Sequence, residues 1–255
     1  MMCSFTDKMD MKAEFQRDGL TIRGRIFGRR PGPQHAVILS HGFLANEKMC
    51  YRYAKLLAKM GFLAVTFDFC GGGIISRSDG SSRNMTVFTE KADLLAVIDG
   101  VKKQFTPVSI SLLGCSQGGL VSGLTARELG AEAISRLILF YPAVCIPDDA
   151  RKGKMMLYKF DPAHIPNLLG RIPMPLGGDY ARTVIDMDPY EALSGYTGPV
   201  LLVHGTKDEI VNIRYARKLR EIYPGCRYEE IEGAGHGFQG EDDDLVCRIL
   251  REFMR

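Results

Sequence analysis

The segment from Val108 to Leu129 constrains the fold of this chain more than any other. An apolar run of strand length at 108–113 leads into Gly-Cys-Ser-Gln-Gly-Gly at 114–119, and helical character follows. A strand, small residues around one serine and then a helix are typical of a nucleophile elbow, whose sharp turn lifts the serine hydroxyl above the strand end. Gly114 and Gly118 suit such a turn because bulkier residues would collide there. The pattern predicts Ser116 as a nucleophile, with the helix N-terminus aimed at it.

The same pattern also fits an ordinary strand-to-helix turn that contains a serine by chance. A serine hydroxyl is a weak nucleophile and needs a base beside it. Five histidines are available, at positions 35, 41, 164, 204 and 236. Partners elsewhere in the chain therefore have to decide between the two interpretations.

His236 lies in a glycine-rich loop, 233–238, which follows the last predicted strand and can return an imidazole over the sheet. The base needs a carboxylate that fixes its tautomer. Asp208 follows the penultimate predicted strand and is the candidate, with Glu209 as the nearest alternative. The chain order Ser116, Asp208, His236 is that of α/β-hydrolases. An ordinary turn aspartate and an ordinary loop histidine are the competing interpretations.

Acyl transfer also needs N–H donors aimed at the developing oxyanion. One comes from the residue after the nucleophile, Gln117, and the other from the loop after an earlier strand. That loop carries Ser-His-Gly-Phe at 40–43, so we expect Phe43 and Gln117 to form the oxyanion hole.

Strands and helices alternate after a hairpin that Asp18-Gly19 predicts. Strands are expected at 36–39, 62–67, 108–113, 134–141, 199–203 and 228–231, and helices at 46–60, 87–103, 120–129, 213–223 and 242–254. This alternation predicts one α/β domain over 1–255, a mostly parallel sheet with helices on both faces. The segment 144–198 shows no clear strand and is too long for a plain connection. We expect it to form a lid over the strand ends, with a surface insertion as the alternative.

Composition limits the function classes. The 255 residues include 33 basic and 30 acidic side chains, and the net charge of +3 does not suggest nucleic acid or an anionic membrane as a partner. Seven cysteines without a C-x-x-C pair indicate neither a zinc site nor a disulfide framework. No stretch approaches the roughly 18 apolar residues of a membrane span. We expect a cytoplasmic protein without a metal.

These motifs together resemble the α/β-hydrolase superfamily over roughly residues 12–255. The matching segments are 40–43, Asp68 with its glycine loop, 114–119, His-Gly-Thr-Lys-Asp at 204–208 and Gly-His-Gly-Phe at 235–238. The resemblance implies an eight-stranded, mostly parallel sheet with an antiparallel second strand, a lid insertion after the sixth strand and a serine hydrolase that uses no cofactor.

Within the superfamily the chain resembles the bacterial cinnamoyl, or feruloyl, esterases. The likeness lies in Ser-Gln-Gly-Gly at 116–119, Phe-Asp-Phe at 67–69, Asn-Met-Thr-Val at 84–87 and two insertion segments, 162–166 and 176–180. It implies that Tyr180 and Asp149 bind the phenolic hydroxyl of the substrate, although simple packing also accounts for Tyr180. Two departures are Cys115 before the nucleophile and the glycines at 71–73.

The sequence thus predicts a serine carboxylesterase that acts on hydroxycinnamoyl esters through an acyl-enzyme. Methionines 155, 156, 174 and 187 are expected to surround the acyl group. The partner would be a small-molecule ester, without nucleic acid or membrane, and a homodimer is left open. A broad short-acyl carboxylesterase, a peptidase of the same fold and a ligand-binding protein without activity are the alternatives.

Overall fold

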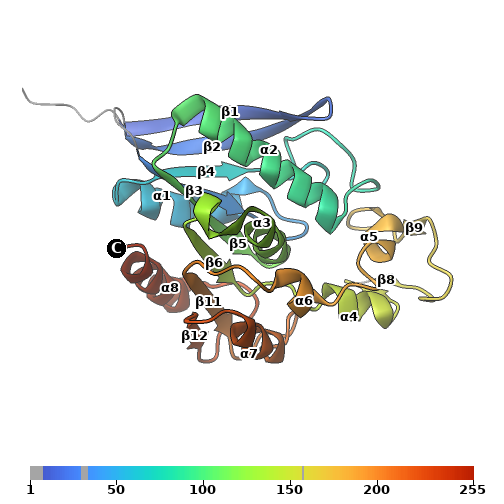
Figure 1. Ribbon diagram of the computed structural model, residues 1–255. Coiled ribbons are helices and arrows are strands. Elements are labelled where there is room, and N and C mark those ends of the chain that lie inside the picture. The colour runs from blue at the N-terminus through green and yellow to red at the C-terminus, as the bar shows by residue number, and fades with distance from the viewer. Residues whose placement is uncertain (1–7, 30–33, 157) are drawn as a thin grey trace, which may run out of the picture.

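The computed structural model describes residues 8–29, 34–156 and 158–255 (Figure 1). It begins with the predicted hairpin, formed by β1 (Lys8–Arg17) and β2 (Leu20–Arg29). Asp18 and Gly19 join the two strands with φ values of 49° and 79°. Positive φ at both central residues is the geometry of the tight hairpin turn that Asp-Gly favours.

Eight strands form one sheet in the order β1-β2-β4-β3-β5-β6-β11-β12. The other six are β3 (His35–Ser40), β4 (Leu63–Phe67), β5 (Ser109–Cys115), β6 (Arg136–Phe140), β11 (Val200–Gly205) and β12 (Arg227–Ile231). β2 is antiparallel to both neighbours, and all pairs from β4 to β12 are parallel. The predicted sheet, including its antiparallel second strand, is therefore confirmed.

Helices cover both faces of the sheet (Figure 1). One face is covered by α1 (Tyr51–Lys59) and α8 (Gly240–Phe253), and a 3₁₀ turn at Glu47–Cys50 leads into α1. The other face is covered by α2 (Val87–Phe105), α3 (Gln117–Ala133), α6 (Pro189–Leu193) and α7 (Arg214–Leu219). A 3₁₀ turn at Arg220–Ile222 follows α7. Side chains alternate along a strand, so in β3 Val37 and Leu39 join the first layer while Ala36 and Ile38 join the second. Such continuous apolar strands are typical of a sheet buried on both faces.

The segment 144–198 lies between β6 and β11. It contains α4 (Ile146–Arg151), β7 (Lys154–Met155), β8 (Tyr158–Lys159), β9 (Leu168–Leu169), β10 (Leu176–Gly177), α5 (Asp179–Arg182) and α6. The two-residue strands pair only as β7 with β8 and β9 with β10, outside the main sheet. In Figure 1, α4, α5, β8 and β9 gather at one end of the molecule. That the segment 144–198 acts as a lid stays a prediction.

No helix of the described part of the chain has the length and apolar character needed to span a bilayer.

Candidate active site

Ser116 stands alone between the last residue of β5 and the first of α3, with φ 54° and ψ −120°. A non-glycine residue in this region is strained and persists only where the surrounding structure enforces it. A Cβ on Gly114 would lie 2.2 Å from the carbonyl oxygen of Gly118, and a Cβ on Gly118 would lie 2.4 Å from that of His41. Both glycines are therefore required by close backbone approach, as the elbow interpretation predicts.

Three side chains that are far apart in the sequence meet above the strand ends. Nε2 of His236 lies 2.9 Å from Oγ of Ser116, and Nδ1 lies 2.8 Å from Oδ2 of Asp208. The imidazole also packs edge-on against the Tyr141 ring, with centroids 4.8 Å apart. A hydroxyl, an imidazole and a carboxylate are thus within hydrogen-bonding distance in series, the arrangement that nucleophilic catalysis by a serine requires. Glu209, the alternative acid, lies exposed at the rim of the cavity.

The carboxylate of Asp208 is held on both oxygens. Oδ1 accepts the N–H groups of Ile210 and Val211 at 2.9 and 2.8 Å. Nε2 of the buried His204 lies 3.2 Å from Oδ2 and 2.7 Å from the carbonyl oxygen of Val211. Burial alone would raise the pKa of Asp208, but the hydrogen bonds from His204, His236 and the Val211 N–H outweigh it and hold that pKa well below its ordinary value.

Sequence reasoning missed the contact of His204 with Asp208, because it placed this histidine only at a strand end. His41 sits behind the site: its Nδ1 lies 2.7 Å from the Gly42 carbonyl oxygen, and its Nε2 accepts the Phe69 N–H at 3.1 Å. Burial lowers the pKa of His41. A neutral imidazole with both nitrogens engaged serves here to hold the loop that leads to Phe43.

The predicted oxyanion residues flank Ser116. Gln117 is the first residue of α3, so its N–H has no partner within the helix. The loop after β3 packs directly on the serine, since a Cβ on Gly42 would lie 3.0 Å from Ser116 Cβ and 3.5 Å from its Oγ. Phe43 follows this contact and lines the same cavity as Ser116 and Gln117.

A cavity of about 440 Å³ opens at Ser116 and His236. Its apolar lining consists of Phe43, Leu44, Ala143, Ile146, Met155, Met156, Ile210 and Val211, and its polar lining includes Gln117, Asp149, Lys154, Tyr180 and Glu209. Of the four methionines expected around the acyl group, Met155 and Met156 line the cavity. The expectation for Met174 and Met187 was wrong: Met174 borders a separate hollow beside the loop 71–82, and Met187 packs against the core.

Tyr180 and Asp149, the two residues expected to bind the phenolic hydroxyl, both line this cavity. The hydroxyl of Tyr180 donates to Oε1 of Gln117, and burial raises the pKa of this tyrosine well above its ordinary value. Burial also raises the pKa of Asp149, and a hydrogen bond from the Cys145 thiol opposes that rise. These two groups supply polar atoms to a mostly apolar cavity.

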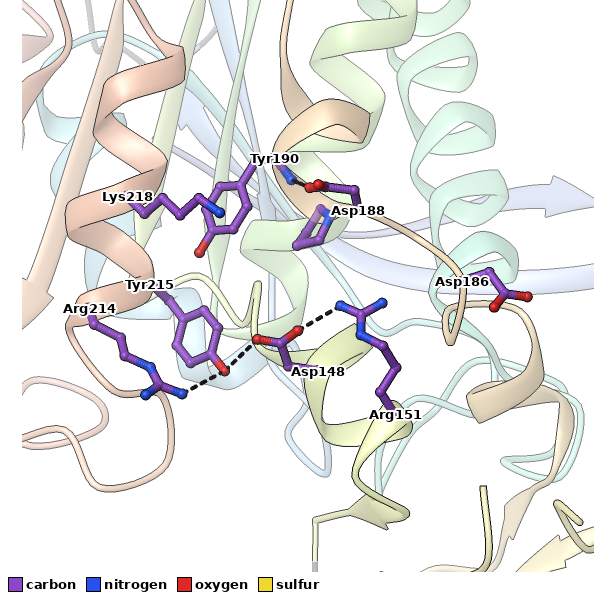
Figure 2. Close-up of a pocket in the computed structure, with 9 residues that line it drawn as sticks. Asp148, Arg151, Asp186, Asp188, Tyr190, Arg214, Tyr215 and Lys218 are labelled. Atoms are coloured by element: carbon purple, nitrogen blue, oxygen red, sulfur yellow. Dashed lines mark hydrogen bonds and ion pairs between the residues drawn. The ribbon is translucent and has the colours of Figure 1, made fainter. Parts of the chain in front are cut away.

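A larger hollow of about 580 Å³ lies between α4, α6 and α7 (Figure 2). Several of its charged groups are engaged with their neighbours: Asp148 accepts from Arg151 at 2.6 Å and from the Tyr215 hydroxyl at 2.9 Å. Nζ of Lys218 lies 4.0 Å from the centroid of the Tyr190 ring. Its lining holds no serine, cysteine or histidine. The side chains around this hollow link α4 to α7. The smaller cavity, which contains Ser116 and His236, is the candidate active site.

No group of three or more histidine, cysteine, aspartate or glutamate side chains in residues 8–29, 34–156 and 158–255 is arranged to hold a metal ion.

Comparison with known proteins assigns the chain to a family. The profile of the family described as "Serine aminopeptidase, S33" matches residues 31–176, more than half of the sequence. The chain belongs to this family of α/β-hydrolases. Monoglyceride lipase from Mus musculus is similar in sequence, with 33% identity over 92% of this chain and 86% of the lipase. The Rattus norvegicus enzyme is 27% identical over the same shares.

Solved structures extend the comparison of this S33-family hydrolase. Est1E from Butyrivibrio proteoclasticus with ferulic acid bound matches with a TM-score of 0.88 and 30% identity, over 95% of this chain and 97% of Est1E. The α/β-hydrolase domain-containing protein 10 from mouse matches with a TM-score of 0.74 at 18% identity, which shows the shared fold. The chain is thus a serine esterase of the α/β-hydrolase fold.

Proposed function

We propose that this protein hydrolyses hydroxycinnamoyl esters, with Ser116 as the nucleophile, His236 as the base and Asp208 as the group that orients it. The observation that carries the proposal is the hydrogen-bonded series Ser116–His236–Asp208, which opens into a cavity with an apolar lining and several polar groups. Similarity to Est1E, whose structure has ferulic acid bound, supports the choice of acyl group.

The proposed reaction has two steps. His236 takes the proton of Ser116 as Oγ attacks the ester carbonyl, and the carbonyl oxygen becomes an oxyanion between the N–H groups of Phe43 and Gln117. Collapse of this intermediate breaks the ester bond, and His236 gives its proton to the leaving alcohol. Water then attacks the acyl-enzyme with the same base, which releases the acid and restores Ser116.

The polar groups of the cavity support an acyl group that carries a hydroxyl. The Tyr180 oxygen donates its proton to Gln117, so its lone pairs remain able to accept a phenolic O–H. Asp149 supplies a carboxyl group at the same cavity. In this proposal the aromatic ring lies among Ile146, Met155 and Met156, whose flexible methionines adapt to its shape.

A monoacylglycerol hydrolase is the second candidate, because the chain is 33% identical to the mouse monoglyceride lipase. A short-acyl carboxylesterase and a peptidase would use the same three residues. Relative kcat/KM values for methyl ferulate, a monoacylglycerol, p-nitrophenyl butyrate and an aminoacyl amide separate these activities. A large preference for any of the last three rejects the hydroxycinnamoyl proposal.

Replacing Ser116 tests the nucleophile directly. Ser116→Ala should abolish turnover of methyl ferulate and labelling by a fluorophosphonate, because it removes the hydroxyl that lies 2.9 Å from Nε2 of His236. Ser122→Ala is the matched control, since it removes one hydroxyl from the same helix and Ser122 Oγ is buried without a hydrogen-bond partner among the described residues. Turnover that survives in Ser116→Ala would end the assignment.

A further inference from the structure

The side chain of Gln117 is held at both of its polar atoms. It is buried, with 1% of its surface exposed. Its Nε2 donates to Oε2 of Glu90 at 2.7 Å, and its Oε1 accepts the hydroxyl of Tyr180. A buried amide that is satisfied on both sides is restrained in orientation, because rotating it away from this position would break both hydrogen bonds.

The two partners come from helices that are far apart in the sequence. Glu90 lies in the first turn of α2, where Thr86 and Thr89 cap the helix reciprocally, and it is 1% exposed. Tyr180 lies in α5 of the insertion. The Tyr180 ring also packs against Phe43, with ring centroids 5.9 Å apart. One tyrosine of the insertion therefore touches both residues that supply the proposed oxyanion donors.

We propose that Glu90 and Tyr180 are positioning residues that clamp Gln117 and thereby keep the oxyanion hole in its reactive geometry. This inference rests on the proposed function. The backbone N–H and the side chain of Gln117 share one Cα, so a side chain fixed at its end restrains the amide at the start of α3. Small displacements matter, since a shift of about 1 Å at a reacting centre can lower the rate on the order of 100-fold.

The carboxyl group of Glu90 suits this role although it is never close to the substrate. Burial, with a smaller contribution from the nearby Asp93, raises the pKa of Glu90 well above its ordinary value, while the hydrogen bond from Gln117 opposes the rise. Gly72 closes the space around the carboxyl, since a Cβ there would lie 2.7 Å from Glu90 Oε1. A neutral glutamic acid and a glutamine have nearly the same shape, so Glu90→Gln can preserve the clamp and Glu90→Leu cannot.

The clamp makes a prediction that recognition of a phenol does not make. An acetyl group is too short to reach a phenol site, so a Tyr180 that only binds the substrate hydroxyl would not affect hydrolysis of p-nitrophenyl acetate. A Tyr180 that positions Gln117 affects every ester. Tyr180→Phe should lower kcat for p-nitrophenyl acetate roughly 10-fold with KM nearly unchanged, less than the roughly 100- to 1000-fold loss when an oxyanion donor is removed.

Tyr158→Phe is the matched control for this variant. Tyr158 lies in the same insertion, and its hydroxyl donates to the carbonyl oxygens of Ile172 and Met174. The control should leave kcat for p-nitrophenyl acetate within about twofold of wild type. An equal loss in both variants would mean a general loosening of the insertion and would overturn the clamp, as would an unchanged kcat in Tyr180→Phe.

Glu90 provides the second arm. Glu90→Leu should lower kcat for p-nitrophenyl acetate roughly 10- to 100-fold, again less than the loss of a whole donor, and Glu90→Gln should restore it to within about threefold of wild type. Thermal unfolding checks that both variants fold. Equal activity of Glu90→Leu and wild type, or no rescue by glutamine in a folded protein, rejects the proposal.

The outcome is separable from that of the proposed function. If wild-type protein hydrolyses p-nitrophenyl acetate through Ser116 but not methyl ferulate, the substrate proposal fails and the clamp is still tested. If no ester is turned over, the rate of fluorophosphonate labelling at Ser116 gives the same comparison of variants, because the phosphoryl oxygen occupies the same hole.

Discussion

The carboxylate of Asp208 shows how much one side chain depends on its surroundings. Four donors face its two oxygens: the N–H groups of Ile210 and Val211, and ring nitrogens of His204 and His236. All of them favour the ionised form, so the group remains charged at a pH where imidazole works as a base. A fixed negative charge both selects the tautomer of His236 and stabilises the imidazolium that forms during the reaction.

Asp208→Asn should therefore reduce kcat/KM for p-nitrophenyl acetate by a factor on the order of 10⁴, as the corresponding change does in other serine hydrolases. The amide keeps the size of the carboxyl group, but it can present N–H to His236 and select the wrong tautomer. Asp161→Asn, at an exposed aspartate paired with His164, is the control and should keep full activity. A loss of less than about tenfold in Asp208→Asn would show that another group orients the imidazole.

Glu90 affects stability with the opposite dependence on pH from Asp208. The lowered pKa of Asp208 means that its charge stabilises the fold above the unfolded value of about 3.9 and is lost only as pH falls through the folded pKa. For Glu90 the folded pKa is raised. Above its unfolded value of about 4.3, the unfolded chain releases a proton that the folded chain keeps, so the free energy of unfolding falls as pH rises.

We expect Glu90→Gln to gain stability relative to wild type as pH rises from the unfolded value of about 4.3 towards the raised folded pKa of Glu90. Glutamine does not titrate, so the variant lacks this term. Urea unfolding at several pH values measures the difference, and Glu132→Gln, at an exposed position of α3, is the control. A difference that is independent of pH would show that Glu90 does not stay protonated in the fold.

The strands and helices of the main sheet could be predicted because local pattern and burial agree there. β3 is a continuous apolar run because both of its faces are covered, and the hairpin turn needs the positive φ that Asp18 and Gly19 adopt readily. Boundaries were less accurate at the elbow. The predicted helix 120–129 begins at Gln117, because the chain passes from β5 through Ser116 directly into α3 without a loop.

The insertion and the clamp could not be predicted in the same way. Strands of two residues, such as β9 and β10, are too short to show any periodicity, and each pairs with a segment that the local pattern does not reveal. Glu90 in the first turn of a helix looks like an ordinary complement to the helix dipole. Its partner Gln117 is 27 residues away, and only the packing of α2 beside α3 brings the two together.

The helix α4 forms part of the cavity wall, and its opposite side is hydrogen-bonded to α7. Ile146 and Asp149 face the cavity, while Asp148 and Arg151 form the network with Tyr215 of α7 that Figure 2 shows. Position 148 and position 149 thus point to different hollows on the two sides of one short helix. The attachment to α7 therefore restrains the helix that carries Asp149.

Tyr215→Phe should raise KM for methyl ferulate severalfold and leave kcat nearly unchanged. It removes one hydrogen bond to a charged, partly exposed carboxylate, which amounts to about 1 kcal/mol, and the change loosens the cavity wall without touching Ser116. Tyr228→Phe, which removes an exposed hydroxyl bound to Glu230, is the control and should leave both constants unchanged. A loss of kcat at constant KM in Tyr215→Phe would contradict this account.

The site joins the two parts of the molecule. Phe43, Ser116, Asp208 and His236 follow β3, β5, β11 and β12, so the sheet supplies the reacting groups at the carboxyl ends of its parallel strands. Tyr180, Asp149 and the methionines come from the segment between β6 and β11. An acyl group in the cavity therefore contacts both parts at once, and its binding energy adds to the stability of the whole fold.

Ferulic acid should accordingly raise the melting temperature of the protein. A ligand that binds only the folded chain stabilises it by about 2.7 kcal/mol at a concentration of 100 times its Kd. For a chain of this length that corresponds to roughly 5–10 °C. Scanning fluorimetry with ferulic acid, and with hexanoic acid as an aliphatic control at the same concentration, measures the effect. Because only ferulic acid carries a phenol for Tyr180 and Asp149, a larger shift with hexanoic acid would favour a lipase or short-acyl esterase over the proposed substrate class.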